Sequence, residues 1–259
     1  MNKNISFFST MKIKKAEQSS QTTKFMFEHL NLGGAATSLG NNFRQLLLTR
    51  VPGWAIFAVK ISDKEKTIAS EFEKLKGVTE IPLYLIFNLK KLVFQSLQKS
   101  SSLQEKGESS LIHILQININ NSQNKENYIV TGKDVQGELK IINPEAYLAT
   151  VEESSQLKID LYCSYRWGSY TAREQKSLLS KKEENVIFLP SDYCPVKIVS
   201  LKTEPVLNTQ EEKLSLTITT NGSISPQDSL LEIAKFLELL MTNIQHQLVI
   251  GKKTEDKAS

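Results

Sequence analysis

Residues 37–61 read TSLGNNFRQLLLTRVPGWAIFAVKI, and this stretch decides the fold. The apolar residues of its first half recur at the spacing of one helix face: Leu39, Phe43, Leu46 and Leu47. Leu48 lies off that face, and Pro52-Gly53 ends the helix. Residues 54–61 then alternate as a strand whose two sets of positions are both largely apolar, which predicts that the strand is covered on both sides.

A second long helix is predicted near the end of the chain, and both helices carry capping signals. Ser225 is the expected N-cap of the later helix, with Pro226 at its first position and Asp228 completing a spacing like that of a capping box. Thr37 or Ser38 can cap the earlier helix by accepting a hydrogen bond from an unpaired backbone N–H.

The later helix is expected to run about 20 residues to Gly251. Its apolar residues form one stripe: Leu230, Ala234, Leu237, Met241, Ile244 and Leu248. Three further apolar residues widen this stripe: Ile233, Phe236 and Leu240. A helix that is apolar over so much of its circumference needs two covers, which are its own sheet and either another part of the chain or a partner helix.

The composition is that of an ordinary globular protein. Hydrophobic residues make up 40% of the chain and charged residues 23%, and no run approaches the roughly 18 apolar residues of a membrane span. The formal net charge of +4 is too small to argue for nucleic-acid binding. Only Arg44, Arg50, Arg166 and Arg173 of the 32 basic residues are arginine, a bias typical of AT-rich coding genomes, as in organelles and some bacteria.

Between the two helices the pattern is mostly that of strands, so the fold class is predicted to be α+β. Residues 1–21 are expected to be a flexible N-terminus and residues 251–259 a disordered tail. Residues 95–110 and 173–185 are polar and charged, and they are expected to be solvated loops. Residues 78–94 are apolar and fit either a helix or a strand.

No constellation of residues points to catalysis or to a metal. His29, His113 and His246 are scattered, and each is expected to be an ordinary strand or helix residue. Cys163 and Cys194 have no metal or redox spacing and are expected to be reduced thiols. The glycine-containing segment GGAATSLGNN lacks the Lys-Ser/Thr of a phosphate loop. The sequence therefore predicts a structural or assembly protein with no catalytic residue and no cofactor.

Four motifs occur in order along the chain. They are Ser38-Leu39-Gly40-Asn41 with Pro52-Gly53-Trp54-Ala55, then Asn88-Leu89-Lys90, then Tyr193-Cys194-Pro195-Val196, and last Thr220-Asn221-Gly222-Ser223-Ile224-Ser225-Pro226. In this order and spacing the chain resembles, over residues 22–248, the amino-terminal assembly portion of the α subunit of bacterial-type RNA polymerase.

The resemblance implies a discontinuous dimerisation domain, residues 22–53 and 196–250, interrupted by a mostly β insert, residues 54–195. It also implies an isologous dimer of this chain with itself. The dimer interface would be formed by the apolar residues of the two long helices: Leu39, Phe43, Leu46, Leu47, Leu230, Ala234, Leu237, Met241, Ile244 and Leu248. The dimer would be the platform for the large β and β′ (or split β′/β″) subunits, which hold the catalytic Mg²⁺.

The residues implied to contact the large subunits are Arg44, Gln45, Leu48, Asn88 and Lys90. Gln45 departs from the family, which has a second arginine at this position, so this contact is expected to be altered or compensated. The family's separate carboxyl-terminal DNA-binding module does not follow the last helix in this sequence, so no specific binding of promoter DNA by this chain is expected.

Three hypotheses about function remain, and they differ in which proteins should co-purify with the chain. An RNA polymerase subunit would bring two very large subunits, an unrelated homodimeric α+β scaffold would bring none, and a small enzyme would show turnover alone. For location, the lysine bias predicts a plastid, and the alternative is the bacterial cytoplasm. No membrane association is expected.

Overall fold

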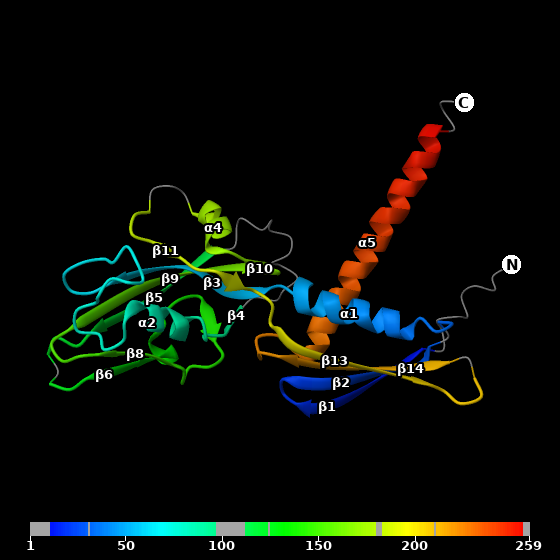
Figure 1. Cartoon of the computed structure of the whole chain (residues 1–259), viewed down its shortest axis with the longest axis horizontal. Helices are drawn as coiled ribbons and strands as arrows, with labels where there is room; N and C mark the ends of the chain where they lie inside the picture. The colour runs from blue at the N-terminus through cyan, green and yellow to red at the C-terminus, as the bar shows by residue number, and fades with distance from the viewer. Residues whose placement is uncertain are drawn as a thin grey trace. The chain divides into compact units, whose positions relative to one another are not determined.

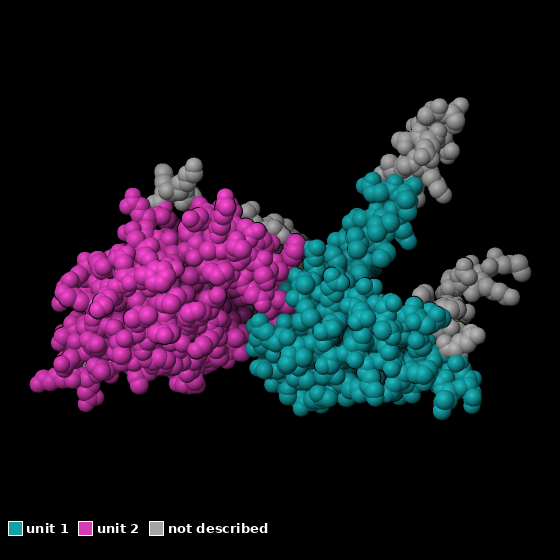
Figure 2. All heavy atoms as spheres, in the orientation of Figure 1, with its two compact units in different colours: residues 1–51, 196–259 teal, residues 52–195 magenta. Residues whose placement is uncertain are grey.

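The computed structural model describes residues 11–30, 32–96, 112–123, 125–179, 183–209 and 211–255, with side chains up to residue 248. The chain divides into two compact units (Figure 2): unit 1 comprises residues 1–51 and 196–259, and unit 2 comprises residues 52–195. The family resemblance implied breaks at 53/54 and 195/196, and the units break at 51/52 and 195/196. The fold is α+β, as the sequence predicts.

Unit 1 is one antiparallel sheet with two helices on one of its faces (Figure 1). The strands, in their order across the sheet, are β1 (Lys12–Ser19), β2 (Thr22–Leu30), β14 (Glu212–Thr220) and β13 (Val196–Pro205). The helices are α1 (Ala36–Arg50) and α5 (Pro226–Glu255). Side chains alternate between the faces of a strand, and the face beneath the helices is apolar and buried: Phe25, Phe27, Leu214, Leu216 and Ile218.

The expectation of a flexible N-terminus over residues 1–21 is wrong for β1, which pairs along its length with β2. Every residue of β1 is exposed. Because no face of β1 is buried, its sequence lacks the hydrophobic alternation that would have predicted a strand. Backbone pairing with β2 supplies the order instead. Lysines on an edge strand also discourage pairing with further chains, and β1 carries three of them, Lys12, Lys14 and Lys15. Residues 1–10 lie outside the described part of the chain.

The N-terminus of α1 is not capped by Thr37 or Ser38, because both lie inside the helix. Glu212 of β14 supplies the cap, since its Oε2 accepts a hydrogen bond from the backbone N–H of Ala36 at 3.2 Å. The Thr37 hydroxyl lies 3.0 Å from the Thr203 hydroxyl of β13. The start of the helix is therefore fixed by the sheet, through a residue far along the chain.

The N-terminus of α5 is capped locally, and this prediction is confirmed. The Asp228 backbone N–H donates to Ser225 Oγ at 3.0 Å, and the Ser225 hydroxyl donates to the Asp228 carboxylate at 2.6 Å. The helix is longer than expected, at 30 residues. Residues 251–255 therefore continue the helix and are not a disordered tail, whereas residues 256–259 lie outside the described part of the chain.

Unit 2 is built on a second antiparallel sheet, in the order β11-β3-β9-β5. These strands are β3 (Gly53–Ser62), β5 (Ile112–Asn120), β9 (Gln156–Arg166) and β11 (Ile187–Phe188). Short pairs accompany it: β4 (Phe94–Ser96) with β7 (Leu139–Ile141), β6 (Tyr128–Thr131) with β8 (Tyr147–Val151), and β10 (Ser169–Tyr170) with β12 (Ser191–Asp192). The helical segments are α2 (Pro82–Leu89), η2 (Gly132–Asp134), α4 (Ala172–Gln175) and η3 (Lys176–Leu178).

Strand β3 is covered on both faces, as its sequence predicts. Ile56, Val59 and Ile61 belong to the large core with α2, whereas Phe57 and Ala58 belong to a second cluster on the other side. Each of these five side chains is at most 3% exposed. Unit 2 thus buries both sides of its central strand without help from another chain.

Two expected loops fall partly on ordered elements. Residues 95 and 96 belong to β4, and residues 97–110 lie outside the described part of the chain. Residues 173–178 are helical rather than a loop. A capping box formed by Thr171 and Glu174 starts α4, with the Thr171 backbone N–H donating to Glu174 Oε2 at 2.7 Å. Residues 180–182 lie outside the described part.

Candidate interaction surfaces

Helix α1 lies very close to its own sheet, and Gly40 makes this approach possible. A Cβ atom at position 40 would clash with Leu201 and would lie 2.8 Å from Leu214 Cδ1. Leu47 lies about two turns further along the same side of α1, and it is completely buried. The prediction that Leu47 lies in a dimer interface is therefore wrong, because the sheet of its own chain covers it entirely.

The remaining apolar residues predicted on the interface side of α1 are partly covered. Leu39, Phe43 and Leu46 are all half-buried. The Phe43 ring stacks on Phe27 of β2, with centroids 6.1 Å apart and planes at 16°. This edge of α1 is seated on the sheet and still presents apolar surface outward.

The stripe on α5 is divided along its length. Ile233 is buried, and Leu230 and Leu237 are half-buried. The residues of the later turns are exposed although they continue the same face: Leu240 (40%), Met241 (54%), Ile244 (45%) and Leu248 (65%). Ala234 is exposed as well. Figure 1 shows why, since α5 starts beside the sheet of unit 1 and then runs away from it.

Helices α1 and α5 meet near the C-terminus of α1. The guanidinium carbon of Arg50 lies 5.7 Å from the centroid of the Phe236 ring, which is within the range of a cation–π contact. The outward sides of Leu39, Phe43 and Leu46 and the exposed turns of α5 therefore belong to two helices that touch.

Arg44, Gln45 and Leu48 lie on the side of α1 opposite to Leu39 and Leu46, because about 100° separates successive helix residues. Arg44 and Gln45 are exposed, and Leu48 is half-buried. Within the described part of the chain, the Arg44 guanidinium makes no hydrogen bond or ion pair. The structure thus places the residues predicted for self-association and those predicted for large-subunit contact on different sides of one helix.

Asn88 and Lys90 differ in what they do within unit 2. The Asn88 side-chain amide donates to the Leu148 carbonyl of β8 at 3.1 Å, and its oxygen accepts from Lys91 Nζ at 3.0 Å. Both ends of the Asn88 side chain are thus used within the chain. Lys90 is exposed and has no side-chain partner among the described residues. Asn88 fixes α2 on β8, and Lys90 is available to a partner.

Helix α2 carries an apolar surface that was not predicted from the sequence. Ile81, Tyr84 and Phe87 are 48%, 62% and 53% exposed. Their spacing of three residues places them on one side of the helix. With Pro82 read as a first helical residue, this spacing could have predicted the surface. Exposed aromatic residues at one place on a protein typically mark an interaction site.

Glu80 fastens the N-terminal end of α2 to β8. It accepts hydrogen bonds from the backbone N–H of Thr150, at 2.8 Å, and from the Tyr147 hydroxyl. Burial, and next the hydrogen bond to Glu80, raise the pKa of Tyr147 above its ordinary value. Tyr147 therefore stays a neutral donor, and the α2 surface is held on a fixed support.

The two ends of unit 2 lie against each other. A Cβ atom on Gly53 would clash with the Tyr193 carbonyl and lie 3.3 Å from Pro195 Cδ. Tyr193 is anchored through its hydroxyl, which lies 2.7 Å from Ser164 Oγ and donates to Gln175 Oε1 at 3.0 Å. Burial raises the pKa of Tyr193, and these hydrogen bonds partly offset the increase. The motif Tyr193-Cys194-Pro195-Val196 thus has a structural role.

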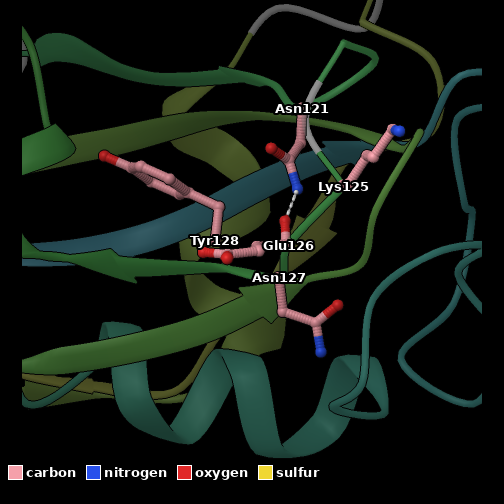
Figure 3. A pocket seen from close by; sticks show the side chains of 5 residues that line it. All are labelled: Asn121, Lys125, Glu126, Asn127 and Tyr128. Carbon is pink, nitrogen blue, oxygen red and sulfur yellow. Dashed lines mark hydrogen bonds between the residues drawn. The ribbon is translucent and has the colours of Figure 1, made fainter.

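The hollow in Figure 3 has a volume of about 340 Å³ and is lined by Asn121 and residues 125–128. The Asn121 amide donates to the carbonyls of Glu126 (2.9 Å), Val151 (3.3 Å) and Glu152 (3.0 Å). Asn121 therefore closes the loop that forms the hollow. The hollow therefore belongs to a surface turn of unit 2.

The titratable residues considered in the sequence are not brought together. His29 Nδ1 lies 3.0 Å from Glu211 in unit 1, and His113 Nδ1 lies 2.8 Å from Glu138 in unit 2. Cys163 and Cys194 are buried and not joined in a disulfide, in line with the predicted reduced thiols. In the described part of the chain, no group of three or more His, Cys, Asp or Glu could hold a metal ion, and no helix is long and apolar enough to cross a bilayer.

Comparison with known proteins assigns the chain to a family. Residues 30–240 match the family described as the RNA polymerase Rpb3/Rpb11 dimerisation domain. The DNA-directed RNA polymerase subunit alpha of Malacoplasma penetrans is 32% identical over 218 residues, which cover 82% of this chain and 63% of that protein. The chain belongs to the RNA polymerase α-subunit family.

Two further α subunits agree with this assignment. That of Limosilactobacillus reuteri is 28% identical over 266 residues, covering 96% of this chain and 77% of the relative. That of Leuconostoc mesenteroides is 31% identical over 235 residues, covering 89% and 68%. The chain thus spans less than two thirds of the Malacoplasma α subunit and somewhat more of the others. Family membership disfavours the alternative of a scaffold unrelated to polymerase.

Proposed function

We propose that this chain is the α subunit of a multisubunit DNA-directed RNA polymerase, which dimerises and forms the platform for the large β and β′ (or split β′/β″) subunits. The observation that carries the proposal is the division of the α5 stripe. Its first turns are covered by the chain itself, and its last turns, Leu240 to Leu248, are exposed. The match to a family described by its dimerisation domain supports a second copy of this chain as the missing cover.

The energetics favour self-association through α1 and α5. Burying one large apolar side chain contributes about 1.5–3 kcal/mol, and a two-fold interface buries every such residue twice. The exposed side chains of Leu240, Met241, Ile244 and Leu248 thus provide several kilocalories per mole, before the outward edges of Leu39, Phe43 and Leu46 are counted. Leu47 contributes nothing to this interface, since its own sheet covers it.

Two separate sets of residues, one on each unit, are proposed to contact the large subunits. In unit 1 they are Arg44, Gln45 and Leu48 of α1, which lie away from the side that carries Leu39 and Leu46. In unit 2 the proposed contact residue is Lys90, and we add the exposed Ile81, Tyr84 and Phe87 at α2. Asn88 is assigned a positioning role, because its side chain is bonded to Leu148 and Lys91. A dimer offers two copies of each set of residues, one for each large subunit.

No step of nucleotide chemistry is assigned to this chain. The catalytic Mg²⁺ and the residues that hold it are proposed to belong to the large subunits, and no cofactor is proposed for the α subunit itself. For location, the lysine-rich composition supports a plastid, whereas the relatives compared are bacterial and support the bacterial cytoplasm. Imaging of a tagged chain in the source cells distinguishes the two.

One purification tests the function. The tagged chain is isolated from its source cells, and the recovered proteins are identified by mass spectrometry. Two very large subunits at one copy each per two α chains are expected. Recovery of the chain as a dimer without large subunits would favour a scaffold, and turnover by the lone chain would favour an enzyme. Met241→Asp/Ile244→Asp is the matched variant, and it should lose both large subunits along with the dimer.

A further inference from the structure

The face of the unit 1 sheet that is turned away from α1 and α5 carries a concentrated positive charge. Leu214 and Leu216 point toward the helices, so Lys213 and Ser215 between them point to the open side. The strand register extends this assignment across all four strands. The charged residues of the open face are Lys12, Lys14, Lys24, Lys202 and Lys213, with Glu28 and Glu204.

Five lysines against two glutamates give this face a net charge of +3, compared with +4 for the whole chain. Each glutamate is already neutralised by one neighbour. Lys14 Nζ lies 2.8 Å from Glu28, and Lys202 Nζ lies 2.5 Å from Glu204. These contacts lower the pKa of both carboxyl groups, so both are ionised at neutral pH and the net charge stands.

Three lysines on the open face form no close ion pair with any residue in the described part of the chain: Lys12, Lys24 and Lys213. At longer range, Lys24 and Lys213 help to lower the pKa of Glu204, and Lys213 helps to lower that of Glu28. They lie on three different strands, β1, β2 and β14, so the unneutralised charge is spread across the sheet and not gathered in a groove. An extended, flat anion fits this distribution better than a small one.

The neutral residues of the face are mostly hydroxyl-bearing: Thr22, Ser200, Ser215, Thr217 and Thr219. The same register also places three apolar residues on this face: Ala16, Met26 and Ile198. Lysine, serine and threonine are typical ligands of nucleic-acid phosphates. The charged face has no arginine fork, which carboxylates would favour, and no aromatic platform for unstacked bases. We propose that this face binds the phosphate backbone of double-stranded nucleic acid without sequence preference.

This contact lies beyond the proposed role as an assembly platform and does not depend on it. The charged face could not be predicted from composition, because a net charge of +4 is unremarkable for a chain of 259 residues. Strand pairing places the lysines of four separate segments on one face while α1 and α5 occupy the other. Readout of bases is not expected, since lysines on a flat sheet reach phosphates and not groove edges.

Salt-dependent binding of the full chain to a labelled duplex DNA of mixed sequence, followed by fluorescence anisotropy, tests the proposal. The variant Lys12→Gln/Lys24→Gln/Lys213→Gln removes the three unpaired lysines. The salt slope is the rate at which the logarithm of affinity falls with the logarithm of salt concentration. Losing three phosphate contacts should reduce this slope by about 2.7. The loss of affinity between roughly 50 and 200 mM salt then becomes about 40-fold smaller than for the natural chain. The variant Lys12→Arg/Lys24→Arg/Lys213→Arg should bind as the natural chain does.

The matched control is Lys74→Gln/Lys140→Gln/Lys158→Gln, which removes three exposed lysines from unit 2 with the same change in net charge. It should leave the salt slope unchanged. Equal losses for both glutamine variants would overturn the proposal in favour of general charge, and so would the absence of any loss. Displacement of the DNA by polyglutamate at equal charge would also overturn it, because an acidic protein would then be the better partner. Circular dichroism confirms that each variant is folded.

Discussion

The two halves of the α5 stripe have the same sequence character and opposite surroundings. In the first half, Ile233 is 1% exposed and is covered by its own chain, whereas in the second half Ile244 is 45% exposed and Leu248 is 65% exposed. The periodicity that places these residues on one face is unbroken. Apolar periodicity therefore shows that a helix face needs cover, and only the structure shows how much of that cover the chain itself provides.

The same distinction separates Leu46 from Leu47 on α1. They are adjacent in the sequence, yet Leu47 is completely buried and Leu46 only half-buried. Gly40 marks the side of α1 that approaches the sheet most closely, and Leu47 lies on that side. One apolar face thus contains residues that stabilise the fold and residues that remain for a partner.

The largest effect is expected from breaking the exposed half of the α5 stripe. Met241→Asp/Ile244→Asp should weaken the dimer by about 1,000-fold or more, because burial of four large side chains is lost and four charges oppose contact. Sedimentation equilibrium or light scattering measures the change. The control Thr242→Asp/His246→Asp alters the opposite side of the same turns and should leave a dimer. A monomeric natural chain would refute the whole assignment of the stripe.

Leu47→Ala tests whether this residue of α1 stabilises the fold of its own chain and not the dimer. Removing this fully buried side chain should lower the free energy of unfolding by about 2–5 kcal/mol, measured by denaturant titration at a protein concentration well above the dimer dissociation constant. Leu46→Ala should cost less stability and should weaken the dimer more. If Leu47→Ala instead weakened the dimer with no change in unfolding, the assignment of Leu47 to the core would be incorrect.

Arg44→Ala asks whether the opposite side of α1 serves a different partner. Loss of one member of a buried charge pair typically costs about 2–5 kcal/mol, so the large subunits should be depleted in a pull-down while the dimer persists. Arg44→Lys should restore recovery only in part, because lysine lacks the two parallel hydrogen bonds of a guanidinium. Normal recovery of both large subunits with Arg44→Ala/Lys90→Ala would place their contact elsewhere.

The smallest effect concerns the cap of α1. Glu212→Ala should lower the free energy of unfolding by about 0.5–2 kcal/mol, the range of a lost N-cap, since the carboxylate that accepts the Ala36 N–H is removed. The control Glu211→Ala, which removes a neighbouring half-buried carboxylate paired with His29, should change the free energy of unfolding by less than about 0.5 kcal/mol. Equal values for the two variants would show that the Ala36–Glu212 bond contributes nothing.

The elements that local signals specify were predictable. The start of α5 follows from Ser225, Pro226 and Asp228, which lie within four residues of one another and form their own bonds. The double cover of β3 follows from its apolar residues on both faces. The function was inferred from the family motifs. Each motif is short and unspecific alone, and only their order along the chain is specific.

The elements that depend on distant partners were not predictable. The cap of α1 comes from Glu212, so the nearby Thr37 and Ser38 misled. Strand β1 is held by pairing with β2 and has no buried residue. The α2 surface was overlooked because Ile81, Tyr84 and Phe87 look like core residues in a sequence, and only their exposure reveals that Leu85, Ile86 and Leu89 fill the core instead.

The contact of Gly53 with Tyr193 and Pro195 has a consequence for how this chain could be rearranged. Unit 2 begins and ends at nearly the same point. For the folding of unit 1, it is therefore equivalent to a long loop whose two ends are held together. The free energy of closing a loop grows only slowly with its length, and the length of unit 2 therefore matters little to the sheet that carries α1 and α5. Such an arrangement permits unit 2 to be shortened, exchanged or grafted as a cassette, with a short linker across the junction preserving the helices on which self-association is proposed to depend.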